Sequence, residues 1–366
     1  MEVFVVFVLW FLLAEALLTA GQFLLRRKRM KASARVILIV VKWLAAILCA
    51  FLPMAGPVQL RVVQPFLMAA YAALLADAAA DTVYSIVTAV RQKERRFGLL
   101  KTVSLLCGAL FLVYGVVNME TVTPHYHTYT SEKLTGEHTV VFIADLHVGS
   151  AQPFSVTEKT LAEVRALRPE ATILGGDIVD DYTTKEEMEA TFRLFGAFDT
   201  PVYYLYGNHD RQGHAEYAGG KKFSREELEA AMTANGVIIL RDEYVELAPD
   251  LLLLGREDIS EGNGRADIAS LPNPAPEKYL IVADHQPVEF KENLAAGTDL
   301  QLSGHTHAGQ LFPLGALYDV IGYNYGDYFA ESGAVMNVSA GACGWRAPFR
   351  TERHCHYEVI RLIPDA

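Results

Sequence analysis

The sequence predicts an N-terminal region of four transmembrane helices followed by a water-soluble α/β domain built in layers. Three observations lead to this fold. The 366-residue chain is 51% hydrophobic and only 20% charged, and its mean hydropathy of +0.18 is high for a soluble globular protein. Long apolar stretches fill residues 1–120, whereas short apolar runs alternate with amphipathic stretches after residue 139.

Four apolar stretches cover residues 3–25, 36–54, 66–90 and 99–119. Each is long enough, at 1.5 Å per residue, to cross a hydrocarbon core of ~30 Å. The first is not expected to be a secretory signal, because basic residues follow it instead of a small-residue cleavage site. The chain is therefore predicted to be a multi-pass protein of the cell membrane.

The connections between the stretches predict the orientation. Six Lys and Arg residues lie between the first two stretches and four between the last two, whereas the middle connection has only Arg61. The positive-inside rule places both basic connections in the cytoplasm. Four crossings then put the N-terminus and everything after residue 120 outside the cytoplasm.

Four charged residues lie deep within the apolar stretches, Glu15, Lys42, Asp77 and Asp81, and Lys101 lies just beyond the second basic connection. Charges at membrane depth are costly, so each needs a reason. One interpretation is a cluster of paired charges inside the helix bundle. The other is a path for protons or a substrate, as in a transporter. The sequence leaves the role of these residues open.

The chain after the last stretch is predicted to hold a polar linker, residues 121–138, and one domain, residues 139–366. Nine short apolar runs of the domain are expected to be strands: 140–143, 172–174, 202–205, 237–240, 251–254, 279–282, 300–302, 335–338 and 357–362. Three amphipathic stretches are expected to be helices: 157–167, 185–195 and 224–235. Residues 125–366 carry 37 acidic against 19 basic residues, so no nucleic-acid partner is expected.

Polar residues follow directly after five of these runs, where open α/β sheets place their functional sites. They form five blocks: Asp145 and His147; Asp177 and Asp180; Asn208, His209 and Asp210; Asp284 and His285; His305 and His307. Any one block is a weak signal. Five blocks, each closing a strand, predict a single site.

The residue types in these blocks predict metal binding. Asp, Asn and His without Cys suit Mn, Fe or Zn ions. Seven such ligands are too many for one ion and are suited to two ions that share a carboxylate. Two ions ~3.5–4 Å apart can hold the attacking and leaving oxygens of a displacement at phosphorus. A phosphorylated substrate is therefore predicted.

The order of the motifs, D-x-H, G-D-x-x-D, G-N-H-D, H and G-H-x-H, resembles that of the calcineurin-like metallophosphoesterase superfamily, over about residues 138–363. The last motif is similar to that of membrane-associated bacterial phosphohydrolases, a branch that includes transmembrane proteins with a metallophosphoesterase domain. The resemblance implies a β-sandwich flanked by helices and two divalent metal ions.

The resemblance also implies a role for each residue. It gives the first ion three ligands, Asp145, His147 and His307. It gives the second ion Asn208, His285 and His305. It makes Asp177 the bridge between the two ions, His209 the acid for the leaving group, Asp210 the residue that fixes the tautomer of His209, and Asp180 a residue that orients ligands.

Other residues carry weaker expectations. Four histidines are expected to be solvated rather than to bind metal: His125, His127, His354 and His356. Whether Cys343 and Cys355 form a disulfide is left open. An aromatic stretch is either core packing or an apolar lip that receives lipid tails: Tyr318, Tyr323, Tyr325, Tyr328 and Phe329.

The leading interpretation is a membrane-anchored phosphohydrolase with two metal ions, acting on phosphoester or pyrophosphate bonds outside the cytoplasm. Because the domain is tethered next to the bilayer, a lipid-linked substrate is favoured. One alternative is a catalytically inactive membrane protein with a binding or regulatory role, against which the complete ligand set argues. The other is a transporter that uses the intramembrane acids.

Overall fold

The computed structural model describes residues 9–20, 32–55, 64–91 and 97–365. The chain divides into a helical unit, Met1–Val117 with Leu311–Leu314, and an α/β unit, Asn118–Gln310 with Gly315–Ala366. Both ends of the first predicted apolar stretch, and most of the basic residues used to predict the orientation, lie outside the described residues.

The helical unit holds long apolar helices: α2 (Ala32–Ala55), α3 (Gln64–Arg91) and α4 (Phe97–Met119). Among the described residues, three segments are long and apolar enough to cross a membrane: Ser33–Leu52, Phe66–Val87 and Leu100–Met119. A fourth apolar helix, Leu9–Ala20, is shorter. The second, third and fourth predicted stretches are thus confirmed as apolar helices, and α3 runs unbroken through its two acidic residues.

The charged residues of the helical unit form ion pairs with one another. Lys42 on α2 lies 2.6 Å from a carboxylate oxygen of Asp77 on α3 and also pairs with Asp81. Lys101 on α4 lies 2.7 Å from Asp77 and 2.8 Å from Glu15 of the helix Leu9–Ala20. The sequence had indicated Lys101 only as a neighbour of a basic connection. These pairs favour the first interpretation, in which the charges hold the bundle together.

The α/β unit contains two sheets of six strands each. In spatial order the first sheet holds β1 (Val122–Ser131), β12 (Cys355–Pro364), β2 (His138–Ile143), β3 (Ala171–Gly175), β4 (Val202–Leu205) and β5 (Val237–Ile239). The second holds β10 (Gly326–Phe329), β11 (Val335–Val338), β9 (Leu300–Ser303), β8 (Tyr279–Ala283), β7 (Leu251–Gly255) and β6 (Glu243–Ala248). Strands β2 to β5 are parallel, and so are β7, β8, β9 and β11.

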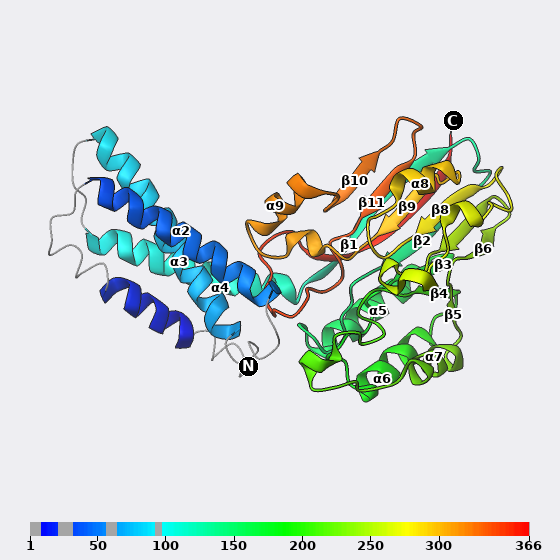
Figure 1. Ribbon diagram of the computed structural model, residues 1–366, viewed down its shortest axis with the longest axis horizontal. Coiled ribbons are helices and arrows are strands. Elements are labelled where there is room, and N and C mark those ends of the chain that lie inside the picture. The colour runs from blue at the N-terminus through cyan, green and yellow to red at the C-terminus, as the bar shows by residue number, and fades with distance from the viewer. Residues whose placement is uncertain (1–8, 21–31, 56–63, 92–96, 366) are drawn as a thin grey trace. The chain divides into compact units, whose positions relative to one another are not determined.

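Helices cover the outer face of the first sheet: α5 (Phe154–Leu167), α6 (Lys185–Phe195) and α7 (Arg225–Ala234) (Figure 1). The remaining helices are short: α8 (Phe290–Ala295), α9 (Leu314–Ile321) and the 3-10 helices Ala215–Ala218, Ile259–Gly264, Ile268–Ser270 and His307–Gly309. Helices α6 and α7 both begin with a capping box, the second of them at Ser224 and Glu227 as the sequence predicts.

The alternation of side chains along each strand builds two cores. On β2, Val141 and Ile143 pack against the helices, whereas Val140 and Phe142 face the second sheet. The inter-sheet core brings these last two residues together with apolar residues of β7, β8 and β9. The result is the predicted sandwich flanked by helices, and all nine predicted strands and three predicted helices are present.

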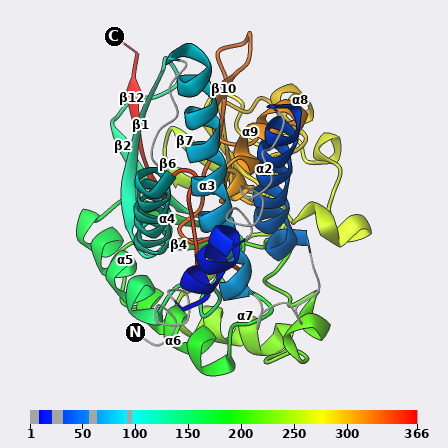
Figure 2. The ribbon, with the colours of Figure 1, turned by 90° about the vertical axis from the view of Figure 1, so that its left-hand side faces the viewer.

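The segment predicted as a linker is mostly a strand. Within residues 121–138, ten residues form β1, which pairs in parallel with β12 and lies at the edge of the first sheet (Figure 2). The prediction of a linker was wrong for this part because an edge strand with polar, half-exposed side chains lacks the apolar alternation that identifies a strand. Strands β6 and β10 were missed for the same reason, since their residues are largely half-buried or exposed.

Candidate metal centre

The predicted site residues lie where five strands end. Strands β2, β3 and β4 of the first sheet and β8 and β9 of the second each lead into one of the polar blocks. The structure brings their side chains into two groups whose potential ligand atoms lie within 4.8 Å of one another. The first group is Asp145, His147 and His307, and the second is Asp177, His285 and His305.

Within the first group, two imidazoles face one carboxylate. The Nε2 atoms of His147 and His307 lie 3.8 and 3.7 Å from Oδ1 of Asp145. All three residues are buried. This spacing leaves room for a cation between the nitrogens and the oxygen.

Asp177 lies between the two groups. Its Oδ2 is 3.2 Å from Nε2 of His285 and 3.7 Å from Nε2 of His147, which belongs to the first group. One carboxylate oxygen therefore faces a histidine of each group, as a bridging ligand must.

Several of these buried atoms have no hydrogen-bond partner among the residues that the structure describes. They include Nε2 of His147, Nε2 of His285 and Oδ1 of Asn208, the residue predicted to complete the second ligand set. Buried polar atoms in folded proteins are nearly always bonded, so a group of orphaned atoms at one place requires an explanation. Lone pairs that converge without a donor fit a pair of divalent cations.

Contacts behind the ligands set the direction of each ring. Nδ1 of His285 lies 2.9 Å from the carbonyl oxygen of Gly175, and Nδ1 of His307 lies 3.1 Å from that of Cys343. Donation from Nδ1 leaves the Nε2 lone pair for a metal. Nδ1 of His147 lies 3.3 Å from Oδ2 of the buried Asp180, which is where a residue that orients this ligand must be.

The loops that carry the ligands are strained. Five predicted ligands have a positive φ between 39° and 72°: Asp145, His147, Asp177, His305 and His307. Such backbone costs about 1–3 kcal/mol for each residue and is typical of functional sites. The loops also approach one another closely, since a Cβ at Gly207 would collide with Asp177 and one at Gly304 would collide with Asp145.

Burial changes the protonation of the ligands. It lowers the pKa of His305 to about 4, with help from the charge of His285, and it holds the pKa of His307 well below its usual range. Burial alone would raise the pKa of Asp177, but the neighbouring histidines His285 and His209 hold it well below its ordinary value. Burial lowers the pKa of His147 and of His285, but the carboxylates that face them outweigh burial and raise the pKa of His147 to about 9 and that of His285 well above its ordinary value. Neutral imidazoles and an ionised carboxylate are the forms that bind metals, so a metal ion must displace a proton from these two rings.

His209 is paired differently from the prediction. Its Nδ1 lies 2.7 Å from Oδ2 of Asp181, so Asp181, and not Asp210, fixes its ring. Asp210 instead accepts backbone N–H groups, among them those of Asp177 at 2.8 Å and Gly207 at 2.6 Å. The assignment of Asp210 to the histidine was wrong because a carboxylate next to His209 in sequence turns back into its own loop. Asp210 therefore ties two ligand loops together.

Sequence reasoning also missed a buried arginine beside the site. The Arg350 guanidinium donates to the carbonyl oxygens of His307 at 2.9 Å, Ala340 at 2.6 Å and Cys343 at 3.1 Å. It thus fixes the loop that carries one ligand. No spacing in the sequence marks it, because its partners are backbone atoms. Trp345, whose ring centroid is 5.3 Å from that of His209, was missed as well.

The remaining predicted residues take ordinary structural positions. Cys343 and Cys355 are both free thiols and both buried. In the aromatic stretch, Tyr323 packs edge-on against Tyr328 with centroids 4.8 Å apart, whereas Phe329 is 73% exposed. Nδ1 of His354 lies 2.6 Å from the side-chain oxygen of Asn118.

Comparisons with known proteins identify relatives of the α/β unit. Residues 138–309 match the family model described as calcineurin-like phosphoesterase. A Helicobacter pylori protein named "Uncharacterized metallophosphoesterase" is 28% identical over 242 residues, which cover 64% of this chain and 62% of that protein. The Bos taurus "Transmembrane protein with metallophosphoesterase domain" is 24% identical over 289 residues, covering 75% of this chain and 64% of that protein.

A solved structure, a dimetal phosphatase from Danio rerio, aligns with a TM-score of 0.38 and 12% identity over 56% of this chain and 87% of that chain. The chain spans less than two thirds of the length of the Helicobacter pylori and Bos taurus relatives that it matches.

Proposed function

We propose that the chain, whose residues 138–309 match the calcineurin-like phosphoesterase family, is a metal-dependent phosphohydrolase anchored in a membrane, with two metal ions in its site. One observation carries the proposal. Asp177 places a single carboxylate oxygen 3.2 Å and 3.7 Å from histidines of two separate ligand groups, an arrangement that two ions sharing a bridge require.

The proposed ligands divide between the ions as the two groups do. One ion takes Asp145, His147 and His307, and the other takes Asn208, His285 and His305, with Asp177 shared. Nitrogen and oxygen ligands suit Mn, Fe or Zn ions. When bound, two such ions supply an activated water and neutralise the charge that develops on the phosphoryl oxygens.

His209 is proposed to protonate the leaving group. Asp181 engages its Nδ1 at 2.7 Å, which holds the ring and leaves Nε2 for the substrate. Its backbone N–H also donates to Oδ1 of Asp177 at 2.8 Å. The acid and the proposed bridge are therefore fixed with respect to each other.

The substrate is proposed to be a lipid-linked phosphate or pyrophosphate reached from outside the cytoplasm. The basic connections support this side, because Lys and Arg are enriched in cytoplasmic loops. The lipid part is supported by the attachment of the α/β unit to apolar helices. A preference for a lipid-linked substrate is tested by comparing kcat/KM for a long-chain polyprenyl pyrophosphate with kcat/KM for a short-chain soluble analogue. Equal values would show that the lipid chain is not recognised.

The side of the membrane is tested with single cysteines. Lys159 on α5 has a side chain that is 76% exposed, and Ser33 at the start of α2 is exposed beside the first basic connection. In a background without Cys49 and Cys107, Lys159→Cys is expected to react with a membrane-impermeant thiol reagent on intact cells. Ser33→Cys is expected to react only after lysis. The reverse pattern would place the domain in the cytoplasm and end the proposal of an external substrate.

A further inference from the structure

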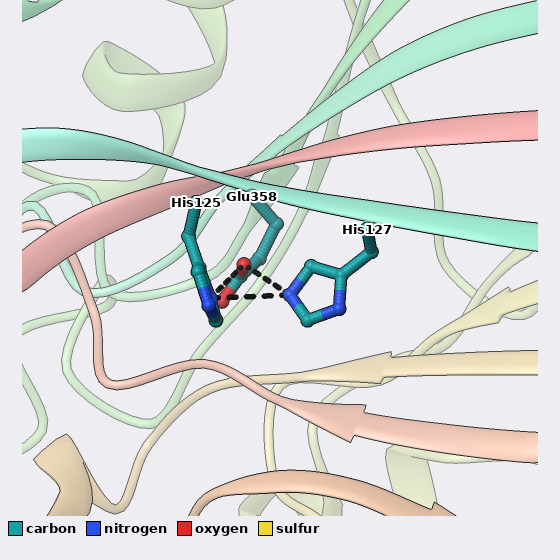
Figure 3. A group of neighbouring side chains, drawn as sticks. All are labelled: His125, His127 and Glu358. Carbon is teal, nitrogen blue, oxygen red and sulfur yellow. Dashed lines mark hydrogen bonds and ion pairs between the residues drawn. The ribbon is translucent and has the colours of Figure 1, made fainter.

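Three side chains meet between the two sheets, on the strands that form one side of the sandwich. His125 and His127 lie two residues apart on β1, so both point to the same face. Glu358 on β12 is the direct partner of His125 in the strand register. Figure 3 shows the three side chains converging on one point. None of them belongs to the metal centre described above.

The three potential ligand atoms form a nearly equilateral triangle. Oε2 of Glu358 lies 3.1 Å from Nδ1 of His125 and 3.0 Å from Nε2 of His127, and the two nitrogens are 3.1 Å apart. Ligands held at ~2.0–2.1 Å from one ion are themselves about 2.9–3.4 Å apart in octahedral or tetrahedral geometry. The edges of the triangle therefore match one face of a coordination shell.

A chain of hydrogen bonds fixes the ring of His127. Its Nδ1 lies 3.3 Å from the hydroxyl of Tyr129, which donates to Oδ1 of Asp327 at 2.9 Å. Asn337 also donates to that carboxylate, at 2.7 Å. A proton on Nδ1 leaves the lone pair of Nε2 directed at Glu358. In metal sites, the ring nitrogen of a histidine that does not bind the metal is typically hydrogen-bonded to a carboxylate or another acceptor in this way.

Glu358 is a buried carboxylate whose charge must be compensated, either by a metal ion or by protons on the surrounding imidazoles. Its side chain is 1% exposed, and its neighbours on the same face of the sheets include the apolar core residues Ile360 and Leu362. Within the described part of the chain Oε1 has no hydrogen-bond partner, although Nε2 of His356 lies 2.8 Å away. That nitrogen accepts the backbone N–H of Ala340 at 3.2 Å. Three imidazoles thus surround one carboxylate, and a buried ion without compensation is expensive.

We propose that His125, His127 and Glu358 bind one divalent transition-metal ion, separate from the pair in the phosphoesterase site. Two imidazoles and a carboxylate are a ligand set of Zn²⁺ with a fourth position open to water, and the side chain of His125, 42% exposed, leaves a path to solvent. The ion joins β1, an edge strand, to its neighbour β12. The expectation of solvated histidines is wrong for His127, whose side chain is only 11% exposed, and for His356, whose side chain is 5% exposed.

The alternative to a metal ion is that protons on the histidines compensate the charge of Glu358. Counting the metal ions bound per chain distinguishes these two possibilities. The full chain, purified in mild detergent, loaded with Zn²⁺ and passed over a chelating resin, is analysed by mass spectrometry for metal per chain. His127→Asn and Glu358→Gln are each expected to hold one zinc fewer than the wild type.

The matched control is His138→Asn. His138 also contacts two carboxylates, Glu170 at 2.7 Å and Asp250 at 2.8 Å, but belongs to none of the potential ligand groups found among the described residues. It should keep the wild-type zinc content. Circular dichroism melting identifies any variant that fails to fold, and added Zn²⁺ should raise the melting temperature of the wild type more than that of His127→Asn.

Failure of this site is distinguishable from failure of the proposed function. The double variant Asp177→Asn with His305→Ala lacks ligands of the phosphoesterase pair. Adding His127→Asn to it should lower the zinc content by one further ion per chain. If folded His127→Asn and Glu358→Gln both hold as much zinc as the wild type, the triangle holds protons and the proposal is overturned.

Discussion

The helical unit and the α/β unit both bury clusters of charged side chains, and they satisfy them differently. In the helices, Lys42 and Lys101 lie within 2.8 Å of the acids around them. In the metal centre, the histidine nitrogens paired with Asp145 lie 3.7 and 3.8 Å away, and Nε2 of His147 has no hydrogen-bond partner among the described residues. A buried cluster that the chain itself neutralises is structural. A buried cluster whose lone pairs converge without a cation is instead suited to binding a metal ion from solution.

Backbone conformation separates the two clusters as well. The charges of the helical unit project from regular helices, whereas five proposed ligands occupy left-handed backbone in loops. Strain of this kind persists only when surrounding structure enforces it. Here Asp210, with its carboxylate bonded to four backbone N–H groups, is one residue that enforces it.

The largest effect is expected at the proposed bridge. Asp177→Asn and His305→Ala should each lower hydrolysis of a generic phosphoester by about 10³-fold or more, because several kcal/mol of transition-state stabilisation depend on the metals. Initial rates at saturating metal, with circular dichroism to establish folding, provide the measurement. Near-normal activity in both variants would refute the paired-metal site.

The matched control lies in the other cluster. Asp77→Asn makes the same isosteric change in a buried carboxylate, but Lys42 keeps Asp81 and Lys101 keeps Glu15 as partners. Activity should therefore remain close to that of the wild type. A loss comparable to that of Asp177→Asn would show that the charges of the helices take part in function, as the transporter hypothesis requires.

A smaller and selective effect is expected at His209 and Asp181. His209→Ala should slow hydrolysis of esters with poor leaving groups by about 10²–10⁴-fold, the usual contribution of an acid catalyst. It should have much less effect on a nitrophenyl ester, whose leaving group departs without a proton. Asp181→Asn should show the same selectivity more weakly, and both variants should keep their metal.

Asp210→Asn distinguishes the two carboxylates. Because Asp210 bonds backbone groups rather than His209, its replacement should lower the melting temperature without preference for either leaving group. If Asp210→Asn instead reproduces the leaving-group pattern and Asp181→Asn does not, the pairing seen in the structure is not the one used in catalysis.

Much of this fold could be predicted from sequence because buried strands are apolar runs. Strands such as β3 and β8 are buried along their whole length, and polar residues that follow such strands must converge. Strand β1 could not be found in this way. Its partner β12 lies more than two hundred residues later in the chain, and polar residues fill the side that packs on the second sheet.

The features of the site that could not be predicted from sequence also have a physical reason. Asp180, Asp181 and Asp210 are equally acceptable partners for a histidine until the loop is folded, and only the folded loop shows that Asp181 meets His209. The triangle of His125, His127 and Glu358 depends on the register of β1 against β12. The spacing of the two histidines in the sequence could not predict that Glu358 lies opposite them.

The proposed activity depends most on a pair of ions in the phosphoesterase site, and a metal titration tests this directly. The His127→Asn variant, which lacks the separate site proposed between the sheets, is stripped with a chelator and given back Mn²⁺ or Zn²⁺ in steps while phosphoester hydrolysis is measured. The stripped protein should be inactive, and activity should rise to a plateau at two ions per chain. Full activity without metal, or a plateau at one ion, would contradict the account.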